Sequence, residues 1–187
     1  FMQDATVRDP EGFVLVDPET GEVEQNSAVP YPQSAHERKA RTNQQLTKLG
    51  ISISATLPPV IAEEEVELRS PEAVVRRTYA LLAVALRAES LATNAPLNRD
   101  ELAEKLPVAF ESLSPREEAF LADEAPPQQA IVDQAWRYEA LYLLEWALGL
   151  VPELPFPATI CDVPLTARTL LKADGFELAV KARLRPT

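Results

Sequence analysis

Residues 128–149 decide the fold that this sequence predicts, and they read QQAIVDQAWRYEALYLLEWALG. Apolar and aromatic residues recur along this stretch at the three- and four-residue spacing that places side chains on one face of a helix. Gly149 can end the helix, because glycine readily adopts the left-handed conformation found just after a helix terminus. We therefore expect one long core helix from about Gln128 to Leu148.

A second core helix is predicted over residues 70–91, which read SPEAVVRRTYALLAVALRAESL. Ser70 can cap the N-terminus, Pro71 suits the first helical position, and Glu72 places an acid in the first turn. Residues 78–86 carry no charge. We therefore expect the middle of this helix to be buried on most sides.

Shorter helices are predicted over residues 98–106 and 114–122 from capping boxes, in which a cap and an acid three residues later satisfy each other's backbone groups. Ser34 can cap a helix over residues 34–49 that Gly50 ends, and residues 166–173 also fit a helix. The proline-rich residues 152–164 are expected to form a connection, and residues 176–184 fit a strand nearly as well as a helix. The predicted fold class is therefore mainly α, a helical bundle-like domain.

The first 33 residues differ from the rest. Residues 13–16 form a short apolar run, residues 17–21 carry turn signals, and residues 22–24 alternate, with no third strand evident nearby. We expect an N-terminal β-hairpin and linker over residues 1–33, followed by the helical domain over residues 34–187. An isolated hairpin is marginally stable in water, so it must pack on the helical body or on a partner.

The composition excludes several classes of protein. A net charge of −11 disfavours nucleic-acid and membrane-surface partners, and no uncharged run is long enough for a membrane helix. One His and one Cys cannot build an ordinary zinc site, and five glycines leave little for phosphate loops. We expect no metal and no cofactor, and a cytoplasmic location. The alternative is a periplasmic location, if a leader preceded Phe1.

Glu139 is the most informative polar residue of the long core helix. Trp146, seven residues on, shares its face, and Trp136 is three residues back. A buried carboxylate needs a partner, and Arg76 or Arg77 on the other core helix could supply it. We favour a structural ion pair that locks the two helices. The alternative is an acid with a shifted pKa, or a ligand anchor.

Two further groups of residues invite functional interpretations. Trp136, Tyr138, Tyr142 and Trp146 could line an aromatic pocket, but aromatic residues at helical spacing more often form core. Cys161 could be a nucleophile, but its only possible histidine partner, His36, lies in a different segment. We expect Cys161 to be a packed residue without a catalytic role.

Several motifs of this chain occur together in one known family. They are Arg38-Lys39-Ala40-Arg41 through Leu49-Gly50-Ile51, Leu68-Arg69-Ser70-Pro71-Glu72, Leu113-Ser114-Pro115-x-Glu117, and Trp136-Arg137-x-Glu139-Ala140-Leu141 followed by Trp146-Ala147-Leu148-Gly149. Over about residues 38–165 the chain resembles a bacterial family known as domain of unknown function 4272. The resemblance implies a helical fold and supplies no reaction.

These observations lead to three functional hypotheses. The first is a non-catalytic binding or protein-interaction module, because the sequence shows no nucleophile–base set and no phosphate loop. The second is an enzyme or small-ligand binder with a polar site around Glu139, Arg77 and Trp136 between the core helices. The third is an acidic regulatory or immunity-type partner of a basic protein, which the net charge of −11 favours.

The N-terminal hairpin generates a prediction about assembly. Both faces of its first strand, residues 13–16, are apolar, so we expect one face to pack on the helical body and the other face, or the open edge, to pair with a second chain. Sizing of the full-length protein and of a version that starts at Ser34 tests this. The full-length protein should dimerise and the shortened one should not. Two monomers at high micromolar concentration would exclude the hairpin as an assembly element.

Overall fold

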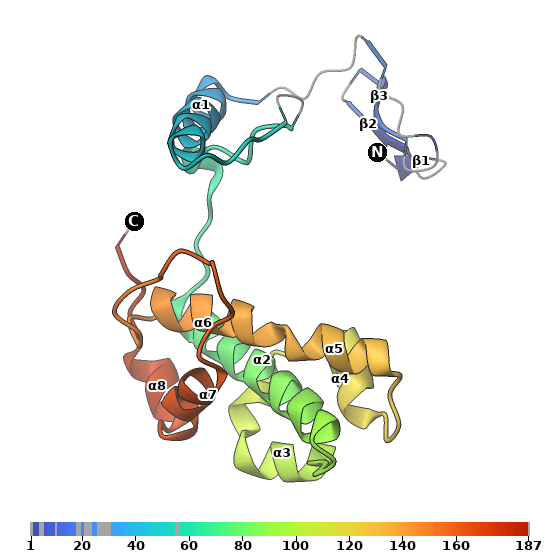
Figure 1. Cartoon of the computed structure of the whole chain (residues 1–187), viewed down its shortest axis with the longest axis vertical. Helices are drawn as coiled ribbons and strands as arrows, with labels where there is room; N and C mark the ends of the chain where they lie inside the picture. Colours follow the sequence, from blue (N-terminus) through green and yellow to red (C-terminus); the bar gives the residue numbers. More distant parts are fainter. Residues whose placement is uncertain are drawn as a thin grey trace. The chain divides into compact units, whose positions relative to one another are not determined.

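The computed structural model describes residues 2–3, 6–9, 11–17, 20, 24–25, 31–54 and 57–186. Its contacts divide the chain into two compact units, Phe1–Leu68 and Arg69–Thr187 (Figure 1). This division does not coincide with the predicted boundary between residues 33 and 34, because the first unit includes the helix predicted to follow Ser34. In the described part of the chain, no helix combines the length and the apolar character that crossing a bilayer requires.

The first unit contains a three-stranded antiparallel sheet with the strand order β1-β2-β3. Its strands are β1 (Met2–Gln3), β2 (Thr6–Arg8) and β3 (Val14–Val16). The predicted first strand is confirmed as β3, but the expectation that no further strand lies near it in the sequence is wrong. β3 pairs with β2, and the turn between them depends on Asp9, whose side chain accepts the Phe13 N–H at 2.8 Å. Gly12 supplies the required positive φ of 94°.

Residues 21–23 lie outside the described residues, so only Glu24 reports on the second strand of the predicted hairpin. The Glu24 N–H donates to the Val14 carbonyl at 2.9 Å, and the Glu24 carboxylate accepts the Val14 N–H at 2.8 Å. Glu24 therefore pairs with the first strand of the predicted hairpin, as the hairpin prediction requires, and β2 occupies the other edge of β3. The dimer itself stays a prediction.

Helix α1 (Gln33–Lys48) follows in the first unit, together with the short 3-10 turn η1 (Glu63–Glu65). The predicted cap, Ser34, lies inside α1, and its hydroxyl bonds to Glu64 instead. Two basic side chains of α1, Arg38 and Lys39, donate to the carbonyls of Ile61 and Leu57. These two basic side chains of α1 therefore form hydrogen bonds within their own unit.

The second unit is helical, and the mainly α fold class is confirmed. Its elements are α2 (Pro71–Ala92), α3 (Arg99–Lys105), the 3-10 helix η2 (Pro107–Glu111), α4 (Pro115–Ala122), α5 (Gln128–Ala135), α6 (Arg137–Ala147), α7 (Val163–Leu171) and α8 (Gly175–Lys181). The predicted caps Ser70, Asn98 and Ser114 each accept a backbone N–H at the start of their helix.

Helix α2 is the centre of this unit, and the other helices surround it (Figure 1). Nine consecutive residues, 78–86, are buried or nearly so, as their lack of charge predicts. One apolar cluster joins Val75, Tyr79 and Leu82 of α2 to α6, α7, α8 and η2, and a second joins Val84 and Ala88 of α2 to α3, α4 and α5. All of the described elements of this unit therefore share one apolar support.

The long helix predicted over residues 128–148 is interrupted at Trp136. There ψ is −7°, and the Glu139 N–H bonds to the Trp136 carbonyl three residues back, at 3.2 Å. The interruption separates α5 from α6, which cover different parts of α2. The interruption lies where the chain passes from one apolar cluster of α2 to the other, so we attribute it to tertiary packing, which overrides the local helical pattern. The side chain of Trp136 is left 58% exposed.

The structure differs from one further prediction near the C-terminus and decides between the alternatives of another. The connection predicted to reach residue 164 ends earlier, because Asp162 caps α7 by accepting the Leu165 N–H at 2.9 Å. The strand-or-helix ambiguity over residues 176–184 resolves as helix α8, in which Asp174 accepts the N–H groups of Phe176 and Glu177. Gly175 is needed at this point, since a Cβ there would come within 3.0 Å of the Tyr79 ring.

A bidentate ion pair joins α2 to the start of α4. The Arg77 guanidinium donates to both carboxylate oxygens of Glu117 at 2.6 Å, and also to the Ser112 carbonyl at 3.2 Å. Glu117 is the capping-box acid of Ser114 and is buried. Burial alone would raise the pKa of Glu117, but the hydrogen bonds from Arg77 and Ser114 outweigh it and lower the pKa to about 2.

Replacing Glu117 should therefore destabilise the fold in a pH-dependent way. Because its folded pKa lies below its unfolded value, its contribution is present above about pH 4.5 and is lost as the pH falls toward 2. Glu117→Gln should lower the free energy of unfolding by about 1–3 kcal/mol at neutral pH, and the difference should shrink in acid. Urea unfolding of both proteins from pH 7 to pH 2 measures this.

The matched control is Glu118→Gln, which removes the half-exposed partner of Arg99 one residue along the same helix. It should cost less than about 1 kcal/mol, because exposed ion pairs contribute little. Equal losses for the two variants at neutral pH would contradict the structural role assigned to Glu117.

Candidate functional site

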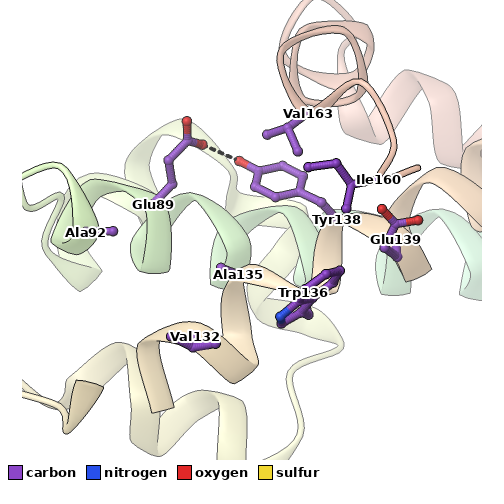
Figure 2. Close-up of a pocket in the computed structure, with 9 residues that line it drawn as sticks. All are labelled: Glu89, Ala92, Val132, Ala135, Trp136, Tyr138, Glu139, Ile160 and Val163. Carbon is purple, nitrogen blue, oxygen red and sulfur yellow. Dashed lines mark hydrogen bonds between the residues drawn. The ribbon is translucent and has the colours of Figure 1, made fainter. Parts of the chain in front are cut away.

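A pocket of about 340 Å³ opens where α5 meets α6. Its walls are mostly apolar and come from four segments: the end of α2, α5, the start of α6, and the turn into α7. The lining residues are Glu89, Ala92, Val132, Ala135, Trp136, Tyr138, Glu139, Ile160 and Val163 (Figure 2). The interruption at Trp136 lies at this space, and the exposed Trp136 side chain forms part of its wall.

The polar groups of the pocket are two carboxylates and one hydroxyl. Figure 2 shows the Tyr138 hydroxyl directed at Glu89 on α2, to which it donates at 2.7 Å. Glu139 on α6 accepts the backbone N–H of Cys161 at 2.7 Å through one oxygen. Among the described residues, neither Glu89 nor Glu139 forms an ion pair with Lys or Arg. The pocket is thus an apolar cavity with an acidic rim.

The predicted ion pair between Glu139 and Arg76 or Arg77 is wrong. Arg77 binds Glu117, and Arg76 binds Glu72 at 2.5 Å and Glu111 at 2.9 Å. Glu139 is only partly buried, and its backbone partner belongs to the connection before α7. The interaction that links α6 to another segment here is therefore a carboxylate–amide hydrogen bond.

The relative direction of α2 and α6 explains this error. Tyr138, at the start of α6, bonds to Glu89, near the end of α2, so the start of α6 lies beside the end of α2. Arg77 precedes Glu89 by about 18 Å along the α2 axis, at roughly 1.5 Å per residue. A side chain in the first turn of α6 cannot reach that far. The sequence pattern contains no information about this direction.

The aromatic residues of α6 have separate environments. Tyr138 is buried, as predicted for a core residue, and burial together with the Glu89 carboxylate raises its pKa. Trp146 lies beneath the Arg185 guanidinium, 5.2 Å from the ring centroid, and does not line the pocket. The Tyr142 hydroxyl donates to the Glu153 carbonyl at 3.3 Å. Of the five predicted site residues, only Trp136 and Glu139 come together.

Sequence reasoning missed Glu89, Ile160 and Val163 as lining residues. Glu89 follows the uncharged middle of α2, where an acid looks like an ordinary solvated end of a helix. Ile160 and Val163 belong to a segment interpreted as a connection. No local signal joins these three segments, because only tertiary packing brings them together.

Cys161 does not have the character of a nucleophile. Burial raises the pKa of its thiol to about 11, and the nearby Glu139 carboxylate adds to the shift. A cysteine nucleophile reacts as the thiolate, which a raised pKa suppresses. His36 lies on α1 in the first unit, where its ring meets the Tyr31 ring edge to face. Within the described ranges, no group of three or more His, Cys, Asp or Glu side chains could hold a metal ion.

The fully buried carboxyl of α6 is Glu145, not Glu139. Glu145 has no solvent exposure, and neither of its oxygens has a hydrogen-bond partner among the residues that the structure describes. Burial raises the pKa of Glu145 to about 8. The Glu145 charge in turn contributes to raising the pKa of Tyr79 on α2, after burial and Asp174. A protonated carboxyl at this position therefore costs much less than an ionised one.

Comparison with known families gives one result. The profile of the family described as Domain of unknown function (DUF4272) matches residues 38–187, which include every residue of the pocket and most of the chain. The matched range extends beyond residue 165, where the resemblance read from the motifs ended. No curated protein and no solved structure matches the chain.

Glu145 should make stability fall as the pH rises. The unfolded chain ionises this carboxyl above about pH 4.5, whereas the folded chain keeps the proton until about pH 8. Between these values the unfolded state is increasingly favoured, by about 1.4 kcal/mol per pH unit. Urea unfolding of the parent and of Glu145→Gln from pH 5 to pH 9 measures this. The variant should lose less stability over that range.

Glu153→Gln is the control, because Glu153 is exposed. Its pH profile should match that of the parent protein. The glutamine introduced by Glu145→Gln carries an unpaired amide of its own, so a constant offset between the curves is expected and only their slopes are compared. Parallel curves for the parent and Glu145→Gln would exclude a buried, protonated Glu145.

Proposed function

Since the chain belongs to the DUF4272 family, whose description assigns no activity, we propose a function from the pocket: a non-catalytic binding module for an apolar organic cation. The observation that carries the proposal is the acidic rim of the pocket at Glu89 and Glu139 around an apolar interior. The proposal combines the first hypothesis from the sequence, a binding module, with part of the site named in the second. Trp136 and Glu139 belong to this site, but Arg77 does not line the pocket.

The size and lining of the pocket suit a small ligand or a single large side chain. Its volume of about 340 Å³ falls within the range of ligand pockets, about 300–1,000 Å³. Val132, Ala135 and Val163 offer an apolar surface to a hydrocarbon body. Burying that body removes apolar area from water, at about 25 cal/mol per Å².

The carboxylates of the pocket determine the sign of the charge that a ligand should carry. Glu89 accepts a hydrogen bond from Tyr138. Glu139 is bonded by the backbone N–H and the thiol of Cys161, and neither carboxylate forms an ion pair with Lys or Arg among the described residues. The described lining residues include no Lys, Arg or His. The exposed Trp136 ring adds a surface on which a cation is attracted to the π-electrons. An ammonium or guanidinium group would therefore be favoured, and an anion would be repelled.

The chemistry of the groups described in this pocket favours binding over catalysis. The thiol nearest the pocket, Cys161, has a pKa raised to about 11, and the Tyr138 hydroxyl has a raised pKa as well. Neither is an effective nucleophile or base at neutral pH. The two carboxylates can attract and orient a cation without further chemistry.

Three probes of equal length test the proposal: n-hexylammonium, n-hexanol and n-hexanoate, titrated by calorimetry. The ammonium should bind most tightly and the carboxylate least. Glu139→Gln keeps the acceptor oxygen for Cys161 but removes the charge, so it should weaken ammonium binding roughly three- to tenfold. Trp136→Ala should weaken it at least as much, because it removes both apolar contact and the ring.

Trp146→Phe is the control for Trp136→Ala, because Trp146 lies under Arg185 and away from the pocket. It should leave the affinity for hexylammonium unchanged. Equal affinities for the ammonium and the alcohol would remove the role given to the carboxylates. Failure of all three probes to bind would overturn the proposed function.

A further inference from the structure

An apolar surface continues beyond the pocket across the connection that leads into α7. Two further cavities, of about 490 and 450 Å³, share Glu139 and Ile160 with the first pocket. Their walls come from α6 and from residues 154–162. Three large apolar side chains stand out on this surface: Phe156 is 65% exposed, Ile160 64% and Trp136 58%. We call these cavities and their shared wall the Ile160 surface.

This surface is uniformly acidic where it is charged. The described residues that line the three cavities include the carboxylates Glu89, Glu139 and Asp162, and none of them is Lys, Arg or His. A contiguous apolar patch with exposed aromatic residues marks an interaction surface rather than ordinary solvent-exposed surface. Charge complementarity then requires basic groups on whatever covers it.

A small cation alone would leave most of the Ile160 surface uncovered. A ligand that fills the pocket of about 340 Å³ covers Trp136 but not Phe156, which lines only the neighbouring cavity among the three. A polypeptide can place successive side chains in neighbouring cavities, since an extended chain advances about 3.3 Å per residue. One apolar side chain of the polypeptide could then pack on Phe156 and another on Trp136.

We propose that the Ile160 surface docks a basic polypeptide segment of a partner protein, with an apolar side chain over Phe156 and a Lys or Arg directed to Glu139 and Glu89. The inference rests on the proposed function, because the Lys or Arg would be the apolar organic cation of the first pocket. It names the class of partner: a protein with apolar residues next to basic ones. A net charge of −11 would speed the association of such a partner.

Selection from a library of random peptides of about ten residues, displayed on phage and panned against the full chain, tests the partner class. Enriched peptides should combine Lys or Arg with neighbouring aliphatic or aromatic residues. A synthetic copy of an enriched peptide is then titrated by fluorescence anisotropy. Phe156→Ser should weaken its binding tenfold or more, as expected for an aromatic anchor at an interface.

Phe176→Ser is the matched control, because Phe176 is also an exposed phenylalanine, 51% exposed, but lines none of the three cavities. It should leave peptide affinity unchanged. Binding of n-hexylammonium to Phe156→Ser should also equal that of the parent, since Phe156 does not line the first pocket. That measurement separates the two proposals.

Three outcomes would overturn the inference while hexylammonium still binds: no enriched peptides, enriched peptides without Lys or Arg, or equal effects of Phe156→Ser and Phe176→Ser. Self-association of the chain that Phe156→Ser abolishes would also overturn it, because a second copy would then be the occupant. If hexylammonium fails to bind as well, the proposed function falls with it.

Discussion

The uncharged middle of α2 is the constraint on which the second unit depends. Residues 78–85 are buried and Leu86 is partly buried, so the chain must cover this helix from several directions. Helices α3, α4 and α5 contribute to one apolar cluster on α2, around Val84 and Ala88, and α6, α7 and α8 contribute to another, around Val75, Tyr79 and Leu82. The interruption at Trp136 lies where the chain passes from the first cluster to the second, and the pocket opens at the same place.

The ionisable groups around α2 follow the cost of burying charge. Glu117 is buried and keeps its charge because Arg77 binds both of its oxygens. Glu145 is buried without a partner among the described residues, and burial raises its pKa to about 8. Glu89 and Glu139 reach solvent at the pocket, and hydrogen bonds with Tyr138 and Cys161 hold their positions. The pocket thus combines two carboxylates with open apolar surface.

The predictable part of the fold is the part that local chemistry determines. Ser70, Asn98 and Ser114 cap helices where their sequence motifs place them, because a capping box needs only neighbouring residues. The interruption at Trp136 was not predictable in this way, because it lies where the chain passes between two apolar clusters. Helix α8 did have a local signal, the Asp174 cap, which the alternating apolar residues 176, 178 and 180 obscured. The close approach of Gly175 to Tyr79 is a contact between distant residues that no local pattern encodes.

The candidate site, like the fold, was predicted only where local spacing determines it. Trp136 and Glu139 were identified from their spacing, but the partner of Glu139 requires the direction of α6 along α2, which no local pattern encodes. Glu145 could have been found from periodicity alone. It lies four residues after Leu141 and three before Leu148, and both of these leucines are buried. The acidic residue on that apolar face indicated a buried carboxyl. Glu139 was chosen instead because it lies near Trp136 and Trp146 in the sequence.

The pocket between α5 and α6 is proposed to bind an apolar cation. Intermolecular nuclear Overhauser effects between n-hexylammonium and the methyl groups of the protein test this binding site most directly. We expect contacts from the hexyl chain to Val132, Ile160 and Val163, which line the pocket. Contacts confined to methyl groups elsewhere, such as Val180 on α8, would contradict it.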